Sequence, residues 1–213
     1  KNSTNHEGST STVLTVKNIF LNSFTIAQNN IVIILGASIL WGLTIWIPYL
    51  NVGTTIGMWA LVVGLSKKDT NFSATSIFNA EYRKYMGEVF LLLGFITLGM
   101  SMGYMFFIIP GIVISLAWSQ AIYLLIDKNL TPLQAIKASN DITYGEKMTM
   151  FFGYVSIIVV LGIVISLIIT ILVAAELYLI FSIFSFCAYI IAFSVMVSSA
   201  IYIYDELSNK LNN

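Results

Sequence analysis

MTMFFGYVSIIVVLGIVISLIITILVA, residues 148–174, contains no charged side chain, and a second apolar run, LYLIFSIFSFCAYIIAFSVMVSSAIYIY, follows at 177–204. Each run exceeds the roughly 20 residues that cross a bilayer as an α-helix. Only Ala175 and Glu176 separate them. Because the backbone in lipid must satisfy its hydrogen bonds internally, the two runs predict an antiparallel helical hairpin. This stretch therefore decides the fold class as all-α and membrane-embedded.

Four further apolar runs precede this hairpin, at residues 31–50, 52–66, 89–104 and 105–126. We expect each to span the membrane, with short outer turns at 48–51, near 99–104 and at 174–176. The run at 52–66 is short and carries Thr54 and Thr55 near its start, so it is a candidate for a tilted or partly re-entrant segment. The prediction is a polytopic protein with about six transmembrane helices. Its single membrane domain covers 12–206, between polar tails at 1–11 and 207–213.

The composition supports a membrane protein and excludes one class of partner. The chain has 213 residues, of which 58% are hydrophobic and 9% charged, and its mean hydropathy is +0.88. A soluble domain of this composition could not keep its apolar surface out of water. The formal net charge is zero, whereas binding of nucleic-acid phosphates requires a basic surface. We therefore expect membrane lipid, and no nucleic acid, among the partners.

The basic residues occupy alternate connections between the predicted spans. They precede the first span, separate the second from the third and the fourth from the fifth, or follow the sixth: Lys1, Lys17, Lys67, Lys68, Arg83, Lys84, Lys128, Lys137, Lys147 and Lys210. Short loops rich in Lys and Arg are retained in the cytoplasm during insertion. The pattern predicts a multi-pass protein of the cell membrane, a bacterial inner or plasma membrane, with both termini in the cytoplasm.

Two cytoplasmic segments that lead into spans have amphipathic patterns, at residues 12–29 and 73–86. The first places apolar side chains at spacings of three and four, a pattern typical of a helix at the membrane surface. These side chains are Val13, Val16, Phe20, Phe24 and Ala27. The second has a similar stripe, with Asn79 and Arg83 on another face; the stripe consists of Phe78, Tyr82 and Tyr85.

The third cytoplasmic segment, at 131–143, carries a specific helix-start signal. Thr131 is followed by Pro132 and, three residues after the threonine, by Gln134. This order predicts a capping box with proline at the first helical position. Gln134, Lys137 and Asp141 then share the polar face of the predicted helix.

The second and third segments also indicate an internal repeat. SKK at 66–68, Ser73 and GE at 87–88 match DKN at 127–129, Thr131 and GE at 145–146. With the N-terminal segment, the chain reads as three units of one surface helix and two spans. Parallel units of this kind are related by an axis along the membrane normal. The alternative, that cytoplasmic loops are commonly basic and capped, stays open.

The longest distinctive pattern resembles a known family. It consists of IIPGI at 108–112, AWS at 117–119, LID at 125–127 and LTPLQAIKAS at 130–139. It is similar to an uncharacterised group of bacterial six-span membrane proteins, which in turn resembles the membrane domain fused to some glycerophosphodiester phosphodiesterases. The resemblance covers most of the chain and implies its fold and membrane location, but no known activity.

The chain departs from this family after the capped helix. The family has a basic stretch with a glycine there and then an aromatic start to the next span. Gly145 and Lys147 keep that outline, with Phe151 and Phe152, whereas Asp141 and Glu146 dilute the positive charge, as does Asn140. A family role of this basic stretch, such as contact with lipid headgroups, does not transfer directly.

The residues needed for common chemistry are scarce. His6 is the single histidine and lies in the polar N-terminal tail, so a histidine metal cluster or a Ser-His-Asp triad cannot be built. We expect no catalytic site, no metal and no cofactor. Gln120 is the deepest strongly polar residue of the spans, and we expect it to form a polar contact between helices.

Two functions of different classes fit this sequence. The first is a non-catalytic scaffold or accessory subunit whose cytoplasmic side contacts a protein or lipid. Its candidate interface residues are Thr131, Gln134, Lys137, Asp141, Arg83 and Lys84. The alternative is a small transporter or pore, formed by one copy or by self-association, with Gln120 and the Thr54-Thr55 region along the path. A continuous polar groove including Gln120 would favour transport, and a tightly packed apolar bundle would favour the scaffold.

Overall fold

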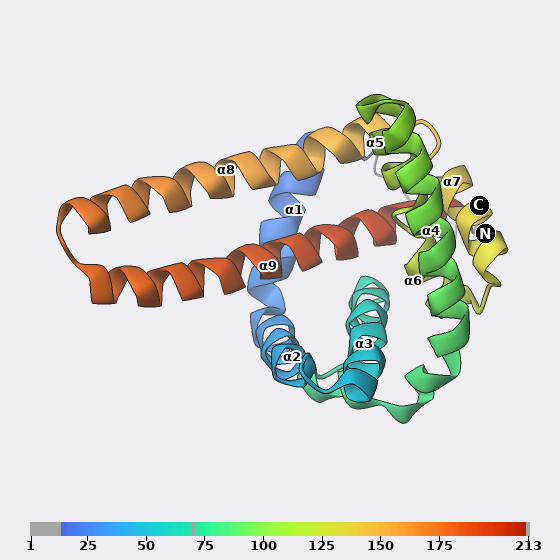
Figure 1. Ribbon diagram of the computed structural model, residues 1–213, viewed down its shortest axis with the longest axis horizontal. Helices are drawn as coiled ribbons and strands as arrows, with labels where there is room; N and C mark the ends of the chain where they lie inside the picture. The colour runs from blue at the N-terminus through green and yellow to red at the C-terminus, as the bar shows by residue number, and fades with distance from the viewer. Residues whose placement is uncertain (1–13, 70, 212–213) are drawn as a thin grey trace, which may run out of the picture.

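A computed structural model describes residues 14–69 and 71–211, and this part of the chain consists of helices joined by short connections, without a strand. The tail at 1–11, including Lys1 and His6, lies outside it (Figure 1). The helices are α1 Val16–Asn29, α2 Ile31–Thr44, α3 Pro48–Ser66, η1 Ala74–Phe78, η2 Ala80–Tyr85, α4 Met86–Phe106, α5 Ile108–Trp118, α6 Ala121–Lys128, α7 Pro132–Ile142, α8 Lys147–Ala174, α9 Tyr178–Ser208 and η3 Asn209–Leu211.

Five of these helical stretches are long and apolar enough to cross a membrane, or six if α1 and α2 form one bent span. The α8–α9 hairpin confirms the two predicted C-terminal helices, and it extends away from the other helices in Figure 1. Glu176, in the turn, adopts a φ of 58°. The buried residues of α8 are Met150, Gly153 and Ile157, so most of its length presents apolar side chains outward.

The predicted turn at 99–104 is wrong, because α4 continues to Phe106 and the chain reverses at Phe107. Glycines allow α4 and α5 to pack closely here. A Cβ on Gly99 would overlap the Trp118 ring, and one on Gly103 would lie 3.0 Å from the Cα of Gly111. The predicted span at 105–126 is divided into α5 and α6 by Ser119 and Gln120.

The predicted span at 31–50 also needs correction, since α2 ends at Thr44. The turn occupies residues 45–47 rather than 48–51, because Pro48 starts α3. Proline suits a first helical position, where the missing N–H has no intrahelical partner. At its other end α2 meets α1 at an angle of 81°.

The N-terminal amphipathic segment forms the predicted helix, but its buried side differs from the prediction. In α1 the buried residues are Ile19, Ser23 and Ala27, while Phe20 and Phe24 are only partly buried. The helix packs against α8 and α9. It is therefore part of the protein core, since its inner face is covered by protein.

The segment predicted as one helix at 73–86 consists of two 3₁₀ helices. Asn79 interrupts the segment with extended backbone and caps η2 by accepting a hydrogen bond from the Glu81 N–H at 3.0 Å. Between these helices and α3 the contact is close, because a Cβ on Gly57 would overlap the backbone of Ile77. The segment runs back along α3, so that α3 and α4 start near one another in Figure 1.

Three groups of buried apolar side chains hold the helices together. The first joins α1, α8 and α9 and includes one residue each of α3, α6 and α7. The second joins α3, η2, α4, α6 and α7, and the third joins α2, α3, η1 and α9. At roughly 25 cal/mol per Å² of apolar area removed from water, such clusters are the main source of stability outside the lipid-facing surface. Helix α3 contributes to all three groups and thus lies at the centre of the fold.

Candidate functional site at the ends of α3, α6 and α9

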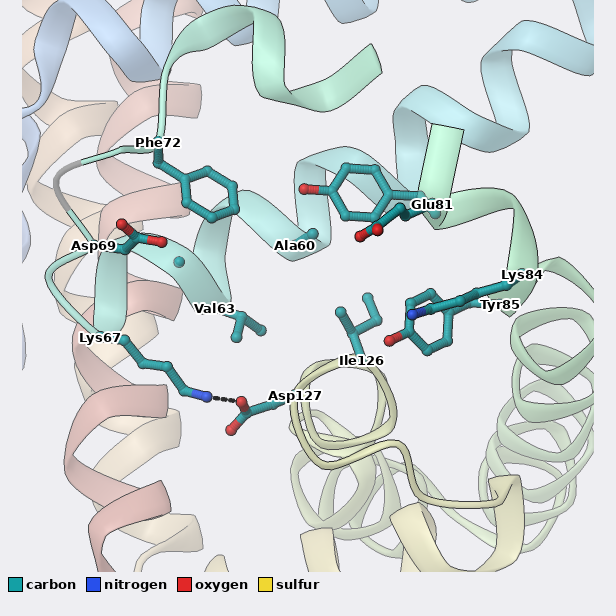
Figure 2. Close-up of a pocket in the computed structure, with 12 residues that line it drawn as sticks. Ala60, Val63, Lys67, Asp69, Phe72, Glu81, Lys84, Tyr85, Ile126 and Asp127 are labelled. Atoms are coloured by element: carbon teal, nitrogen blue, oxygen red, sulfur yellow. Dashed lines mark hydrogen bonds and ion pairs between the residues drawn. The ribbon is translucent and has the colours of Figure 1, made fainter. Parts of the chain in front are cut away.

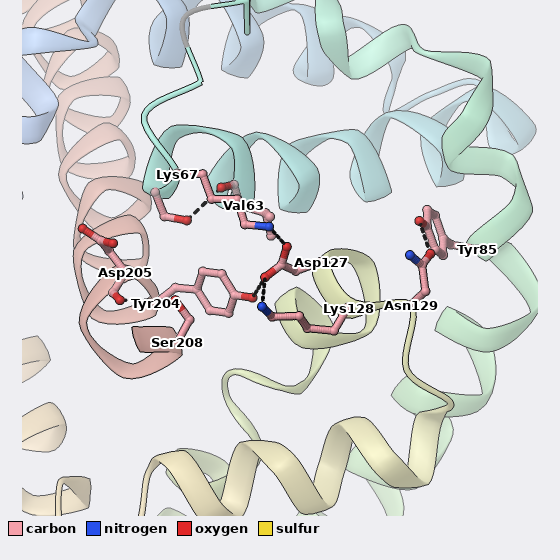
Figure 3. A network of polar contacts seen from close by, with 10 residues as sticks. Val63, Lys67, Tyr85, Asp127, Lys128, Asn129, Tyr204, Asp205 and Ser208 are labelled. Carbon is pink, nitrogen blue, oxygen red and sulfur yellow. Dashed lines mark hydrogen bonds and ion pairs between the residues drawn. The ribbon is translucent and has the colours of Figure 1, made fainter. Parts of the chain in front are cut away.

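A buried carboxylate joins the C-terminal ends of three helices (Figure 3). The Asp127 side chain, in α6, is only 2% exposed and forms an ion pair with Lys67, just after α3. The Tyr204 hydroxyl of α9 donates a hydrogen bond of 2.7 Å to the second carboxylate oxygen. Lys128 Nζ lies 3.9 Å from the same oxygen. We call these four residues the Asp127 network.

The network gives Asp127 the partners that a buried charge requires. A carboxylate removed from water is costly unless it is paired and hydrogen-bonded. Burial and the positive charge of Lys128 lower the pKa of the Lys67 ammonium from its usual value, and the Asp127 carboxylate opposes that shift. The network therefore fastens α3, α6 and α9 to one another at a single buried anion.

Left-handed residues end both helices that contribute charged groups to this network. Lys68 follows α3 with a φ of 57°, and Asn129 follows α6 with a φ of 51°. Such residues commonly terminate helices. Asn129 then accepts a hydrogen bond of 2.7 Å from the Tyr85 hydroxyl, which ties the end of α6 to the start of α4.

A pocket of about 290 Å³ adjoins the network, between α3, η2 and α6 (Figure 2). Its floor includes Ala60, Val63 and Ile126, and charged and aromatic side chains surround it. The charged ones are Lys67, Asp69, Glu81, Lys84 and Asp127, and the aromatic ones are Phe72, Tyr82 and Tyr85. The pocket thus offers positive charges, negative charges and flat apolar surfaces to a ligand.

A second polar cluster stabilises the break between α5 and α6. Ser139 of α7 is fully buried. Its hydroxyl donates to the Ala117 carbonyl at 2.7 Å and accepts from the Gln120 N–H at 3.2 Å. Thr143 donates to the Ser139 carbonyl at 2.8 Å. Interrupted helices in a membrane need such substitutes for the lost backbone bonds, so α7 supports the break.

Gln120 lies at this break and is 0% exposed. Its Nε2 donates to the Ser119 hydroxyl at 3.0 Å, whereas its Oε1 is buried without a hydrogen-bond partner among the described residues. Thr54 and Thr55 belong to a different cluster, in which Thr54 bonds Thr44 at 2.8 Å and Thr55 accepts from Trp41 at 2.9 Å. The structure does not bring these residues together with Gln120.

The predicted helix start of α7 is confirmed. Thr131 and Gln134 form the capping box, in which Gln134 accepts from the Thr131 N–H at 3.1 Å. Gln134, Lys137 and Asp141 are exposed along one side of α7, opposite the buried residues Ala135, Ser139 and Ile142. Their role at a partner interface stays a prediction.

Arg83 and Lys84 lie apart from this surface, on η2. The Arg83 guanidinium carbon is 5.8 Å from the centre of the Tyr49 ring. The Lys84 ammonium is 4.9 Å from the centre of the Tyr85 ring. The six predicted interface residues therefore form two separate groups, one on α7 and one on η2.

The sequence interpretation missed the central residues of the site. The sequence patterns contain Asp127 only within LID at 125–127 and DKN at 127–129, and Tyr202 and Tyr204 only at the end of the apolar run at 177–204. The structure buries Tyr202 to 7% exposure and Tyr204 to 0%. A tyrosine at the end of a span fits an interface and a core equally well, because it has an apolar ring and a polar tip. The signal that distinguishes them is a buried carboxylate within reach.

The chemistry of the site is that of ion pairing and binding. Within residues 14–69 and 71–211, no group of three or more His, Cys, Asp or Glu side chains is placed to hold a metal ion. Comparisons of the chain with protein-family models, curated proteins and solved structures find no match.

Proposed function

We propose that the protein is a non-catalytic membrane scaffold or accessory subunit that presents the exposed side of α7 to a partner protein. The observation that supports this role is the way α7 is held. Its start is capped by Thr131 and Gln134, and the buried Ser139 bonds both sides of the α5–α6 break. A helix fixed in this way presents Lys137 and Asp141 with little loss of conformational freedom on binding.

The proposed location is the cell membrane of a bacterium, with both termini in the cytoplasm. The support is the placement of Lys and Arg in alternate connections together with the apolar helices. We also propose that the chain is related to the six-span family, and the support is the sequence pattern at residues 108–139. The internal repeat is supported by Lys68 and Asn129, two left-handed residues that each precede a capping box.

Photo-crosslinking in native membranes tests the scaffold function. A photoreactive residue at position 137 should capture a defined protein, and Lys137→Glu should reduce its co-purification in mild detergent. Lys17→Glu is the matched control, because Lys17 is an exposed lysine on α1 and the change in charge is the same. Equal recovery of the partner with both variants would reject the α7 surface.

One observation favours the second candidate, a small transporter or pore. The unpartnered Oε1 of Gln120 could accept a hydrogen bond from a polar substrate if the α5–α6 break opened, since broken helices line sites in many transporters. The complete burial of Gln120 favours the scaffold. Purified Gln120→Leu protein in liposomes separates the two: a transporter loses flux, and a scaffold keeps its partner.

A further inference from the structure

The pocket between α3, η2 and α6 contains a carboxylate without an ion-pair partner among the described residues. Among the carboxylates that line the pocket, Asp127 pairs with Lys67 and Lys128, whereas Asp69 and Glu81 form no ion pair with a described residue. The Glu81 carboxylate points toward the interior of the pocket in Figure 2. Because Glu81 is exposed, water solvates its charge, and a cationic ligand in the pocket could pair with it.

Tyr82 adds an aromatic ring with a polar hydroxyl to the lining of the pocket. This side chain lines the pocket and is only 9% exposed, yet its hydroxyl has no hydrogen-bond partner among the described residues. The other buried tyrosine of the pocket, Tyr85, donates to Asn129. Gln120 Oε1 is the buried side-chain polar atom without a partner in the described part of the chain, so the Tyr82 hydroxyl is open to solvent and can bond either water or a ligand.

Phe72 contributes a ring that the fold holds in place. The ring points into the pocket in Figure 2 and lies directly on α3 at Gly64, where a Cβ would overlap it. Its position opposite Glu81 leaves an aromatic surface and a carboxylate facing a common space.

We propose that this pocket binds an organic ammonium group, with Glu81 as the counter-ion and the rings of Phe72 and Tyr82 as walls. Aromatic faces attract ammonium ions through their quadrupoles, and Lys84 already places its own ammonium over Tyr85 at 4.9 Å. Lys84 also provides a positive charge for the anionic group of a zwitterion. The chemistry fits the headgroup of a zwitterionic phospholipid or a free amine.

The volume and position of the pocket agree with such a ligand. About 290 Å³ lies near the lower end of the range for small-molecule sites. The pocket lies beside the ends of α3 and α6, next to Lys67 and Asp127, which the charge pattern assigns to the membrane surface. The site uses no residue of α7, so it is independent of the proposed scaffold surface.

Calorimetric titration of the full chain in detergent tests the proposal, with choline as the probe and 3,3-dimethylbutan-1-ol as its uncharged isostere. We expect saturable binding of choline and none of the alcohol. Glu81→Gln should weaken choline binding roughly two- to fivefold, the range for one exposed charge pair. Glu88→Gln is the matched control, because Glu88 is also exposed but lies outside the pocket.

Two further arms complete the test. Phe72→Leu should weaken choline binding without changing the charge. Lipid extracts from protein reconstituted in equal parts of phosphatidylethanolamine and phosphatidylglycerol identify the source: enrichment of the zwitterionic lipid in the wild type but not in Glu81→Gln indicates a headgroup, and choline binding without enrichment indicates a free amine. Equal binding of choline by wild type and Glu81→Gln, or equal binding of the neutral alcohol, would overturn the proposal.

Discussion

The guanidinium of Arg83 lies over the ring of Tyr49, 5.8 Å from its centre, although the charge pattern assigns the two residues to opposite sides of the membrane. Neighbouring contacts agree with this arrangement, since a Cβ on Gly53 would be 3.8 Å from Met86 at the start of α4. The other end of α3 meets Asp127 at the end of α6 through Lys67. The start of α3 thus contacts the start of α4, and the end of α3 contacts the end of α6.

This relationship predicts that the α2–α3 turn lies on the cytoplasmic side. In a background of Cys187→Ser, a cysteine at Trp46, an exposed turn residue, should react with a membrane-impermeant maleimide only in inverted vesicles. In the proposed topology, a cysteine at Lys137 serves as the cytoplasmic reference and one at Glu176 as the outer reference. Reaction of position 46 in intact spheroplasts would support six complete crossings instead. The positive-inside rule permits both arrangements, because residues 45–51 carry no charge.

The Asp127 network makes a prediction about stability. Lys67→Met removes one partner of a carboxylate that is 2% exposed, and we expect a loss of about 1–3 kcal/mol, reduced from the value for a fully buried pair because Lys67 is half exposed. Tyr204→Phe should cost about 1 kcal/mol through one lost hydrogen bond. Thermal unfolding in detergent measures both. Lys137→Met is the control: because Lys137 lies on the exposed side of α7, this change should leave the midpoint of thermal unfolding unchanged.

Ser139→Ala should destabilise the α5–α6 break. The substitution leaves the Gln120 N–H without its Ser139 partner and removes a donor to the Ala117 carbonyl, at a cost of about 1–3 kcal/mol for an unsatisfied buried group. Ser38→Ala is the control, because among the described residues the Ser38 hydroxyl bonds only the Ile34 carbonyl of its own helix. Hydrogen exchange at residues 117–121 should accelerate in the first variant and not in the second. Equal protection in both would show that the break does not depend on Ser139.

Thr131→Ala should cost about 1 kcal/mol by removing the cap of α7. Thr131→Ser keeps the hydroxyl and should restore most of that loss. Proteolysis within residues 131–143 measures local opening of the helix. If the alanine variant resisted cleavage as well as the wild type, packing of Ala135 and Ile142 alone would account for the position of α7.

The α8–α9 hairpin and the α7 cap were predictable because each depends on local sequence. An uncharged apolar run in lipid has to become a helix, and Thr131-Pro132-Leu133-Gln134 satisfies its own helix start. The ends of α2 and α4 were harder to predict from the sequence. Proline started α3 where a turn was expected, and glycines between α4 and α5 served for close packing rather than for a turn.

The sequence by itself determined that the chain is helical, that several of its runs are long and apolar enough to cross a membrane, and which connections are basic, because these properties depend on local composition. The tertiary structure decided that Asp127 is buried with Lys67 and Tyr204, that Ser139 replaces backbone partners at the α5–α6 break, and that Arg83 reaches Tyr49. These contacts join residues far apart in the chain. They depend on how helices pack, which neither the composition nor the spacing of a single segment specifies.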